Sequence, residues 1–448
     1  MLVGAVTDYP FIPKSNARLE PGQFWSIPLS DGRFACGRVL RVDRDAAYGR
    51  RTTFIAGLLD WVGSEPPTAE SIAGAPLLEA GHAHIATISE EGGTVLGARA
   101  LESDGLMPPA EVRSHWSPSY PALRAERRFI AGDPAPQWER RWVSSPLTDE
   151  MLRPSATGRG IVQFSRILSV EDFGRLADWL RQCPQMTLRV YGSSEIRDLE
   201  FLRFFPSLRR FDADTLYELG NANGLRHLPE DLEALALGAT RGKLDLTILA
   251  RFRRLEMLYL EGQTKKLDVI SGLTSLEKLT LRSITLPDLS LLLPLSRLVS
   301  LDLKLGGTRD LSLLPRIGRL RYLELWLIKG LSDISAVAHL SHLRYLFLQA
   351  LKRVTRLPDL SRAHALRRVH LETMKGLRDL RPLATAPALE ELLLVDMPNL
   401  QPEDLRPLVG LPRLKAVTAG LGSDRKNAQA RELLALPEVR GTLDWRAD

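Results

Sequence analysis

One short pattern recurs through the second half of the chain and constrains the fold more than any other feature. Leucine or another apolar residue fills the frame L-x-x-L-x-L, as in LRYLEL from Leu320 and LRYLFL from Leu343. Ten copies, the first and last of them degenerate, follow one another at steps of 21 to 25 residues between Leu208 and Leu414. A fixed period of this size predicts a stack of short structural units that share one continuous core.

Each copy predicts one strand and one return segment. The apolar residues of the frame alternate, so their side chains point to one face of a short strand. A second apolar cluster follows at a nearly constant offset, as in DLSLLLPL, DISAVAHL and DLRPLATA. A single unit of this kind cannot bury its own apolar faces, so neighbouring units must stack. We therefore expect a solenoid with short parallel strands on its concave face.

The pattern resembles that of leucine-rich repeat proteins over roughly residues 185 to 440. The D-[IL]-x-x-[LVI] return segments are similar to those of the internalin-like bacterial class. The family places an asparagine beyond the last strand leucine, separated from it by two residues, where it bonds backbone groups inside the turn. This chain has other residues at that position, which predicts a locally different turn. They are Gln263, Ile284, Ile328, Met374 and Met397.

The region between residues 15 and 120 has another pattern and predicts a small β-rich domain. Two strand-like runs flank Asp31-Gly32, a dipeptide that is typical of hairpin turns. The segments TTFIAGLLDW, HAHIATIS and GTVLGARAL predict three further strands, and PTAESIAGAPLLEAG predicts a short helix and loop. The expected fold class is therefore α+β, with this domain followed by the repeat array.

This domain resembles the immunity protein 26 family of bacterial polymorphic toxin systems. The resemblance is carried by PGQFWSIPLSDGRFACGRVL, then FIAGLLDWVG, then GTVLGARALESD, and it covers about a hundred residues. It implies a protein-binding antidote to a secreted toxin, without catalysis. The motif residues are Ile27, Pro28, Asp31, Gly32, Gly37, Arg38 and Gly97.

The boundaries of the array follow from changes in composition. Residues 121–160 are rich in Pro, Arg, Ser and Gly and lack a hydrophobic period, which predicts a linker before an array over 161–448. Ser169 followed by Asp172 is typical of a capping box and predicts an N-terminal cap helix over 169–183. Residues from about 424 to 448 are expected to form the C-terminal cap. Caps are needed because the open ends of an array expose its core.

Composition favours a cytoplasmic protein. The 60 basic and 54 acidic residues leave a net charge of +6, which is small for 448 residues, so no nucleic acid partner is expected. The two cysteines, Cys36 and Cys183, lie far apart in the sequence, which favours a reducing compartment. The N-terminal stretch lacks a basic region and a long apolar run, so we expect no signal peptide and no membrane partner. We expect a monomer, although the sequence does not determine the oligomeric state.

No pattern predicts catalysis. There is no GxxxxGK[ST] loop, no GxGxxG after a strand and no set of cysteines at zinc spacing. His339 and His342, like His82 and His84, lack a third ligand, so polar surface positions are the better interpretation. We therefore expect no enzyme activity, no cofactor and no metal. A hydrolase with its site in the N-terminal domain is the weakest alternative.

The residues between the strand leucines are expected to line the concave face and bind a protein partner. Aromatic residues and arginine, the usual anchors of protein interfaces, gather there on adjacent repeats. The alternative is that these side chains pack on one another, or under a terminal segment, and only stabilise the sheet. The candidate binding residues are Tyr259, Glu261, Tyr322, Glu324, Trp326, Tyr345, Phe347, Gln349, Arg368, His370 and Glu372.

These features favour a non-enzymatic immunity-type protein. It would block a toxin or toxin-associated partner through its repeats, its N-terminal domain or both. The alternative is a leucine-rich repeat scaffold or signalling adaptor with no immunity role.

Overall fold

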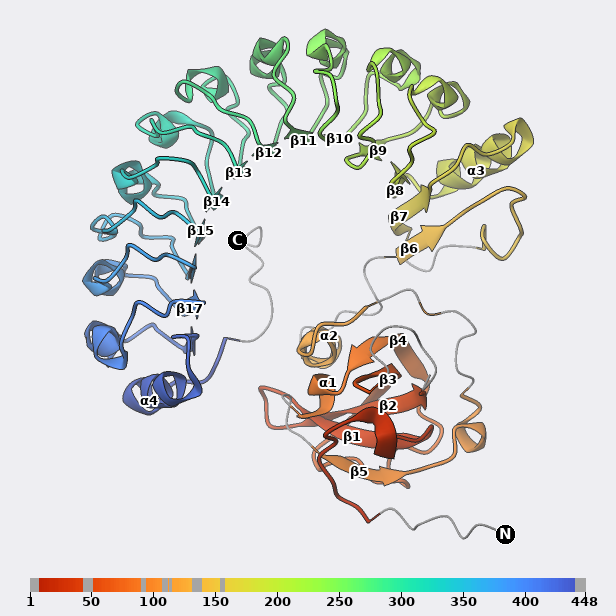
Figure 1. Ribbon diagram of the computed structural model, residues 1–448, viewed down its shortest axis with the longest axis vertical. Coiled ribbons are helices and arrows are strands. Elements are labelled where there is room, and N and C mark those ends of the chain that lie inside the picture. Colours follow the sequence, from red (N-terminus) through yellow and green to blue (C-terminus); the bar gives the residue numbers. More distant parts are fainter. Residues whose placement is uncertain are drawn as a thin grey trace. The chain divides into compact units, whose positions relative to one another are not determined.

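The structure is a computed structural model that describes residues 8–42, 51–89, 94–106, 112, 115–130, 139–153 and 158–439. It divides into two compact units, one with the described residues up to 130 and one with those from 139 onward (Figure 1). Each unit has hydrophobic core clusters of its own. No helix in the described part of the chain is long and apolar enough to span a membrane.

The first unit is built on an antiparallel sheet of five strands in the order β4-β3-β2-β1-β5. The hairpin predicted at Asp31-Gly32 joins the first two strands, and Gly32 supplies the positive φ of 87° that the turn requires. The elements of this unit are the 3-10 helix η1 (Asn16–Arg18), β1 (Gln23–Pro28), β2 (Phe34–Arg41), β3 (Thr53–Gly63), β4 (Leu77–His84), α1 (Ala86–Ser89), β5 (Val95–Ala98), η2 (Glu102–Asp104) and α2 (Tyr120–Phe129).

Both faces of this sheet are buried. Trp25, Val39 and Phe54 lie in one apolar cluster, and their neighbours in sequence, Phe24 and Leu40, lie in the other. This is the period-two alternation of a strand with a core on each side. Two of the predicted segments differ from expectation. The fourth strand, β4, begins within the segment expected to be helix and loop, because it pairs along β3, and α1 replaces the second half of the strand expected in HAHIATIS.

The second unit is built on a parallel sheet of thirteen strands that follow one another in chain order. In Figure 1 the strands line the inner side of an arc and the return segments lie on its outer side. The strands are β6 (Glu139–Trp142), β7 (Arg159–Phe164), β8 (Gln185–Val190), β9 (Arg210–Ala213), β10 (Ala234–Leu237), β11 (Met257–Glu261), β12 (Lys278–Arg282), β13 (Ser300–Lys304), β14 (Tyr322–Trp326), β15 (Tyr345–Gln349), β16 (Arg368–Glu372), β17 (Glu391–Val395) and β18 (Ala416–Ala419).

The ten copies of the leucine frame correspond to β9 through β18. Strand leucines stand in register from one repeat to the next, as Leu258, Leu279 and Leu301 do, and they are buried. One continuous apolar cluster runs from Val143 to Leu434. The expected solenoid with parallel strands on its concave face is therefore confirmed.

Most return segments begin with an aspartate that caps a 3-10 turn. Asp333 accepts a hydrogen bond from the Ser335 amide at 2.8 Å, and this bond lowers the pKa of the Asp333 carboxyl. Asp245, Asp288 and Asp310 cap their segments in the same way, which explains the recurring D-[IL] in the sequence. The 3-10 helices are η3 (Glu200–Phe204), η4 (Asn223–His227), η5 (Leu246–Arg251), η6 (Leu267–Gly272), η7 (Ser290–Leu292), η8 (Leu314–Arg316), η9 (Ser335–His339), η10 (Arg381–Thr385) and η11 (Pro402–Leu408).

The turn after each strand explains the missing asparagine ladder. The residue after each strand from β11 to β17 is left-handed. From β11 to β16 its amide donates to the carbonyl of the last strand residue in the next repeat, as Leu327 does to Gln349 at 2.8 Å. Among the substitutes, Gln263 accepts a hydrogen bond from the Leu244 amide at 2.8 Å, and the Met397 sulfur accepts one from the Met374 amide at 3.2 Å. Residues such as Ile284 and Met374 fill the same place by burial. The left-handed positions are Gly262, Ser283, Leu305, Leu327, Ala350, Thr373 and Asp396.

Two α-helices belong to this unit. The helix α3 (Val170–Gln182) begins at the capping residue Ser169, as predicted, but two strands, β6 and β7, precede it in the sheet. The helix α4 (Asp424–Leu434) follows the last strand. The capping role of both helices stays a prediction. Residues 121–160, expected to be a linker, hold most of α2, all of β6 and the start of β7.

Candidate protein-binding face

The strand residues that lie between the leucines form three columns across β11 to β17. Strict register sets them side by side, so that Tyr322, Glu324 and Trp326 of β14 neighbour Tyr345, Phe347 and Gln349 of β15. The same register places Arg368, His370 and Glu372 of β16 next in line. The repeats thus bring together all the candidate residues of β14 to β16, while Tyr259 and Glu261 lie three strands away on β11.

Two tyrosines and an arginine pack together at the first column. The rings of Tyr322 and Tyr345 meet edge to face with centroids 5.1 Å apart. The Arg368 guanidinium lies 5.5 Å from the centre of the Tyr345 ring and pairs with Glu391 at 2.5 Å. The Tyr322 hydroxyl donates to Glu324 at 3.1 Å, and burial together with that carboxylate raises the pKa of Tyr322.

The single tryptophan of the cluster is held between two cations. Arg282 lies 5.1 Å and Lys304 lies 5.9 Å from the centre of the Trp326 ring system, within the range of cation–π attraction. Arg282 also pairs with Glu261 at 3.0 Å, and Glu261 accepts the Tyr259 hydroxyl at 2.9 Å. These contacts connect β11 to β14 along the face.

The Phe347 and His370 rings stack face to face with centroids 4.1 Å apart and an angle of 8° between their planes. Burial, with a smaller effect of the Arg368 charge, lowers the pKa of His370 to about 4, so the imidazole is neutral at pH 7. Burial raises the pKa of Glu372, although the hydrogen bond that Glu372 accepts from Gln349 at 2.6 Å acts to lower it.

The aromatic side chains of this face are therefore neither fully exposed nor fully buried. Tyr322, Trp326, Tyr345 and Phe347 are each half-buried, because their rings lean on one another and on the cations beside them. Such mutual packing fixes their rotamers before any ligand arrives. The outer edges of the rings stay accessible within the described part of the structure.

The same middle column continues beyond the candidate residues. Trp142, Gln163, Arg189 and Asp212 extend it across β6 to β9. The strands β6 to β8 lack the leucine frame and so gave no signal in the sequence. Arg189 bonds Asp214 at 2.7 Å and lies 3.4 Å from Asp212. Burial and the neighbouring Asp214 raise the pKa of Asp212 to about 7.

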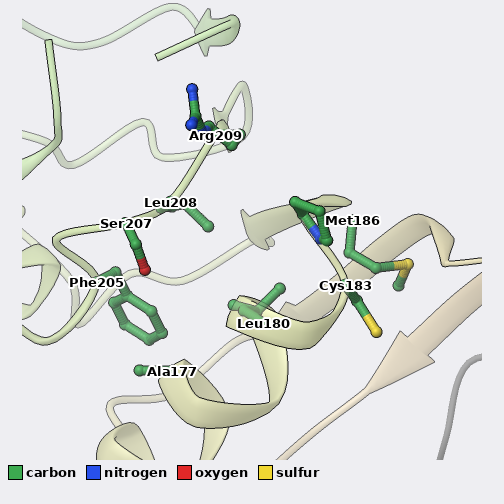
Figure 2. Close-up of a pocket in the computed structure, with 9 residues that line it drawn as sticks. Ala177, Leu180, Cys183, Met186, Phe205, Ser207, Leu208 and Arg209 are labelled. Carbon is green, nitrogen blue, oxygen red and sulfur yellow. The ribbon is translucent and has the colours of Figure 1, made fainter. Parts of the chain in front are cut away.

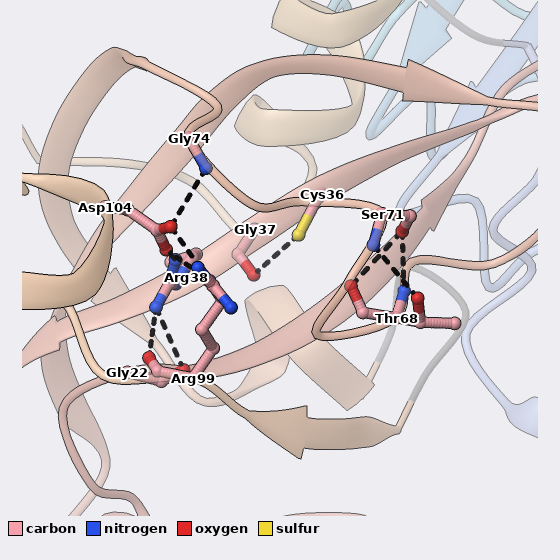
Figure 3. Close-up of polar contacts among 9 residues, drawn as sticks. All are labelled: Gly22, Cys36, Gly37, Arg38, Thr68, Ser71, Gly74, Arg99 and Asp104. Carbon is pink, nitrogen blue, oxygen red and sulfur yellow. Dashed lines mark hydrogen bonds and ion pairs between the residues drawn. The ribbon is translucent and has the colours of Figure 1, made fainter.

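The N-terminal motif residues mostly serve the fold of the first unit. Arg38 is fully buried, and its guanidinium pairs with Asp104 at 2.7 Å and donates to the carbonyls of Gly22 and Arg99 (Figure 3). Burial alone would raise the pKa of Asp104, but bonds from the Gly74 amide, Arg38 and Arg99 lower it to about 2. This residue is therefore poorly placed to touch a partner.

The other motif positions divide between core and turn. Ile27 is buried, Pro28 closes the β1–β2 ladder, and the absence of a side chain at Gly37 and Gly97 lets the rings of Trp25 and Phe24 pack against the backbone. Asp31 and Gly32 lie exposed at the hairpin tip, where Asp31 pairs with Arg33 at 2.7 Å.

The predicted histidine pairs and a pocket beside α3 are the remaining features of interest. Among the described residues no group of three or more His, Cys, Asp or Glu could hold a metal, and His82 stacks on His115 at 4.8 Å. A small pocket opens beside α3, and Arg209 is the charged side chain among those that line it (Figure 2). It is lined by Ala177, Leu180, Cys183, Pro184, Met186, Phe205, Ser207, Leu208 and Arg209.

No family model matches the chain, and no curated protein matches it. Among solved structures the chain is similar to an internalin of Listeria monocytogenes, with 20% identity and a TM-score of 0.41 over 62% of this chain and 85% of that chain. It is also similar to a leucine-rich repeat protein of Leptospira interrogans, with 16% identity and a TM-score of 0.35 over 65% of this chain and 92% of that chain. The second unit is a leucine-rich repeat solenoid, as its parallel sheet, its strand register and the period of its sequence show.

Proposed function

We propose that this chain is a non-enzymatic protein-binding scaffold whose partner docks on the concave face of β11 to β17. The observation that carries the proposal is the cluster of Tyr322, Trp326, Tyr345 and Phe347 on two adjacent strands, interleaved with Arg282, Lys304 and Arg368. Aromatic and arginine side chains supply most of the binding free energy in protein interfaces.

The packing of the cluster supports this use. Association costs free energy for every flexible side chain that becomes fixed. Rings already held by Arg368, Lys304 and His370 lose little further freedom on binding. A face that only stabilised its own sheet would be served equally by aliphatic residues, such as Leu393 and Val395 at the matching positions of β17.

We further propose that the scaffold is an immunity-type protein that blocks a bacterial toxin or a toxin-associated protein in the cytoplasm. The hairpin motif from Pro21 to Leu40 and the small antiparallel sheet around it support this finer proposal. A repeat face that covers a toxin's own surface would inhibit it sterically, without chemistry. The alternative is a scaffold or adaptor with no immunity role.

A pull-down from host lysate, read by mass spectrometry, tests the scaffold proposal. The wild-type chain is compared with a Tyr322→Ala, Trp326→Ala, Phe347→Ala variant. The matched control removes three exposed apolar side chains elsewhere on the repeat unit, through Ile167→Ala, Val170→Ala and Val409→Ala. We expect one protein that the wild type and the control retain and the first variant loses. Retention by all three chains would contradict binding at this face.

Growth rescue tests the immunity proposal separately. The chain is co-expressed with a toxin encoded beside its own gene, and survival is compared with and without the three face substitutions. Survival that depends on the face supports immunity. Death despite folded, wild-type protein would leave the scaffold without its immunity role.

A further inference from the structure

A lysine stands at the same place in three successive turns, at the edge of the sheet where the strands end. Lys329, Lys352 and Lys375 each follow the left-handed residue of their turn by two positions, after β14, β15 and β16, and all three are exposed. The amides of Leu327 and Ala350 donate to the next repeat at 2.8 and 2.9 Å, which stacks the three turns in order. The turns therefore follow one another at about one strand spacing, about 4.8 Å. We call this row the lysine ladder.

The ladder lies in a patch with an excess of positive charge. Each turn is counted from its left-handed residue to the aspartate that opens the return segment, and the four turns after β13 to β16 carry seven basic and four acidic residues. The turns on either side, over 283–288 and 396–404, carry no basic residue, so the patch has a boundary at both ends. Its basic residues, all exposed, are Arg309, Lys329, Lys352, Arg353, Arg356, Lys375 and Arg378.

The acidic residues of these turns do not neutralise the patch. Each of the four aspartates accepts a hydrogen bond from the backbone amide two residues on, as Asp359 does from Ser361 at 2.8 Å. Asp379 also pairs with Arg381, outside the patch, at 2.8 Å. Within the described part of the chain, none of the seven basic side chains forms an ion pair with a carboxylate.

The patch adjoins the candidate binding face. Trp326 is the last residue of β14, and Lys329 follows it by three positions. Protein interfaces commonly have an apolar centre surrounded by a polar rim. A partner seated on the aromatic cluster therefore has part of its own rim over the lysine ladder. Like charges that face each other across an interface are repelled, so a rim of negative charge is favoured there.

A nucleic acid fits this patch poorly. Single-stranded nucleic acids bind where aromatic rings lie among basic groups, because the bases stack on the rings. The four turns contain no aromatic residue. The last residue of β16, directly before the turn of Lys375, is Glu372, whose carboxylate would repel phosphate. Carboxylates on a protein partner need no stacking surface, so an acidic polypeptide is the better match.

We propose that the lysine ladder and the arginines beside it bind an acidic segment of the protein partner, while the apolar part of the same partner covers the aromatic cluster. The four turns span three strand spacings, about 14 Å. An extended segment of about four or five residues covers that length. The assignment rests on the proposed scaffold function, because it names the chemistry of the partner.

Binding of a fluorescein-labelled octaglutamate peptide to the full chain, followed by fluorescence anisotropy, tests the assignment. At about 0.1 M salt, charges act over roughly 10 Å, which is less than the length of a five-residue strand, about 17 Å. A Lys329→Glu, Lys352→Glu, Lys375→Glu variant should bind the peptide about tenfold more weakly than the wild type.

The matched control reverses three exposed arginines at the opposite edge, before β14 and β16, through Arg316→Glu, Arg319→Glu and Arg362→Glu. It changes the net charge by the same amount and should bind within about twofold of the wild type, because those charges lie beyond the reach of the ladder. Circular dichroism shows whether the ladder variant remains folded. If it does not, glutamine replaces glutamate at the same three lysines.

Three results would overturn the assignment. The first is a wild type that does not bind octaglutamate, or a ladder variant that binds it equally well. The second is equal weakening in the control, which would show an effect of net charge alone. The third is tighter binding of an octathymidylate DNA that the ladder variant loses, which would assign the patch to nucleic acid. No partner is present in this assay, so its failure is distinct from failure of the pull-down, which concerns the scaffold role.

Discussion

At the scale of single residues, charged side chains are buried in ion pairs in the first unit and lie against aromatic rings on the concave face of the second. Arg38 and Asp104 are enclosed in the first unit, with both side chains fully buried. Arg282, Lys304 and Arg368 instead lie against rings on the concave face. The first arrangement resists change because an unpaired buried charge is costly.

We predict that Asp104→Asn destabilises the first unit by about 3–5 kcal/mol, because it leaves the Arg38 guanidinium buried without its carboxylate. Urea unfolding followed by tryptophan fluorescence measures the loss. Asp31→Asn, which breaks the exposed pair with Arg33, should have a much smaller effect. Equal losses in the two variants would show that Arg38 and Asp104 are not coupled as described.

The low pKa of Asp104 also predicts that the first unit loses stability in acid. Its folded pKa of about 2 lies below the value of about 3.9 in an unfolded chain. A lowered carboxyl pKa stabilises the fold above the unfolded value, and the contribution is lost as the pH falls toward 2. The thermal unfolding midpoint of the wild type should therefore fall more steeply between pH 4 and 2 than the midpoint of Asp104→Asn. Parallel curves would contradict the assignment.

His370 predicts a pH dependence at milder acidity. Its folded pKa of about 4 lies below the value of about 6.5 expected when unfolded, so between those values the unfolded chain binds more protons. His370 therefore makes the repeat unit less stable as the pH falls from about 6.5 to about 4. His370→Phe, which can keep the stack on Phe347, should lose that part of the slope. An unchanged slope in the variant would rule out a buried neutral imidazole.

At the scale of elements, each repeat from β11 to β17 closes with a left-handed residue after its strand. The backbone conformation costs about 1–2 kcal/mol at a residue other than glycine, and it is kept because the amide reaches the next repeat, as Ala350 does to Glu372 at 2.9 Å. The turn thus replaces the asparagine ladder by backbone bonding and burial.

We predict that Ala350→Gly raises the free energy of unfolding by about 0.5–1 kcal/mol, because glycine adopts a φ of 54° without strain. The matched control is Ala428→Gly on the exposed side of α4, which should lower stability by about 1 kcal/mol. Urea unfolding midpoints give both signs. A loss at Ala350 would mean that the turn is not under the strain described.

The sequence predicts the elements well where one period governs burial. The leucine frame located β9 to β18, because each leucine occupies the same buried register position. It missed β6 to β8, whose segments, such as ERRW in β6, pack without that frame. It also gave the three columns of the concave face from spacing alone. It could not show that Lys304 bridges Glu324 and Trp326, or that Arg38 is buried, because those contacts depend on side-chain rotamers and on residues distant in sequence.

At the scale of the whole molecule, the two units have separate cores. The apolar cluster of the repeat unit contains residues from Val143 onward, and the clusters of the first unit end at Ala125. We therefore predict that a fragment over 139–448 folds alone, with one cooperative thermal transition by circular dichroism. A fragment that binds hydrophobic dyes and melts without cooperativity would show that the repeat unit needs the first unit.

Photo-crosslinking in the host cell tests whether a partner binds on the concave face of the repeat unit. A photoreactive phenylalanine analogue is placed at Phe347 on the concave face and, in a control chain, at the exposed Val409. We predict that irradiation joins a specific protein to the chain labelled at Phe347 and none to the control. A partner captured from Val409 and absent from Phe347 would contradict binding on the concave face.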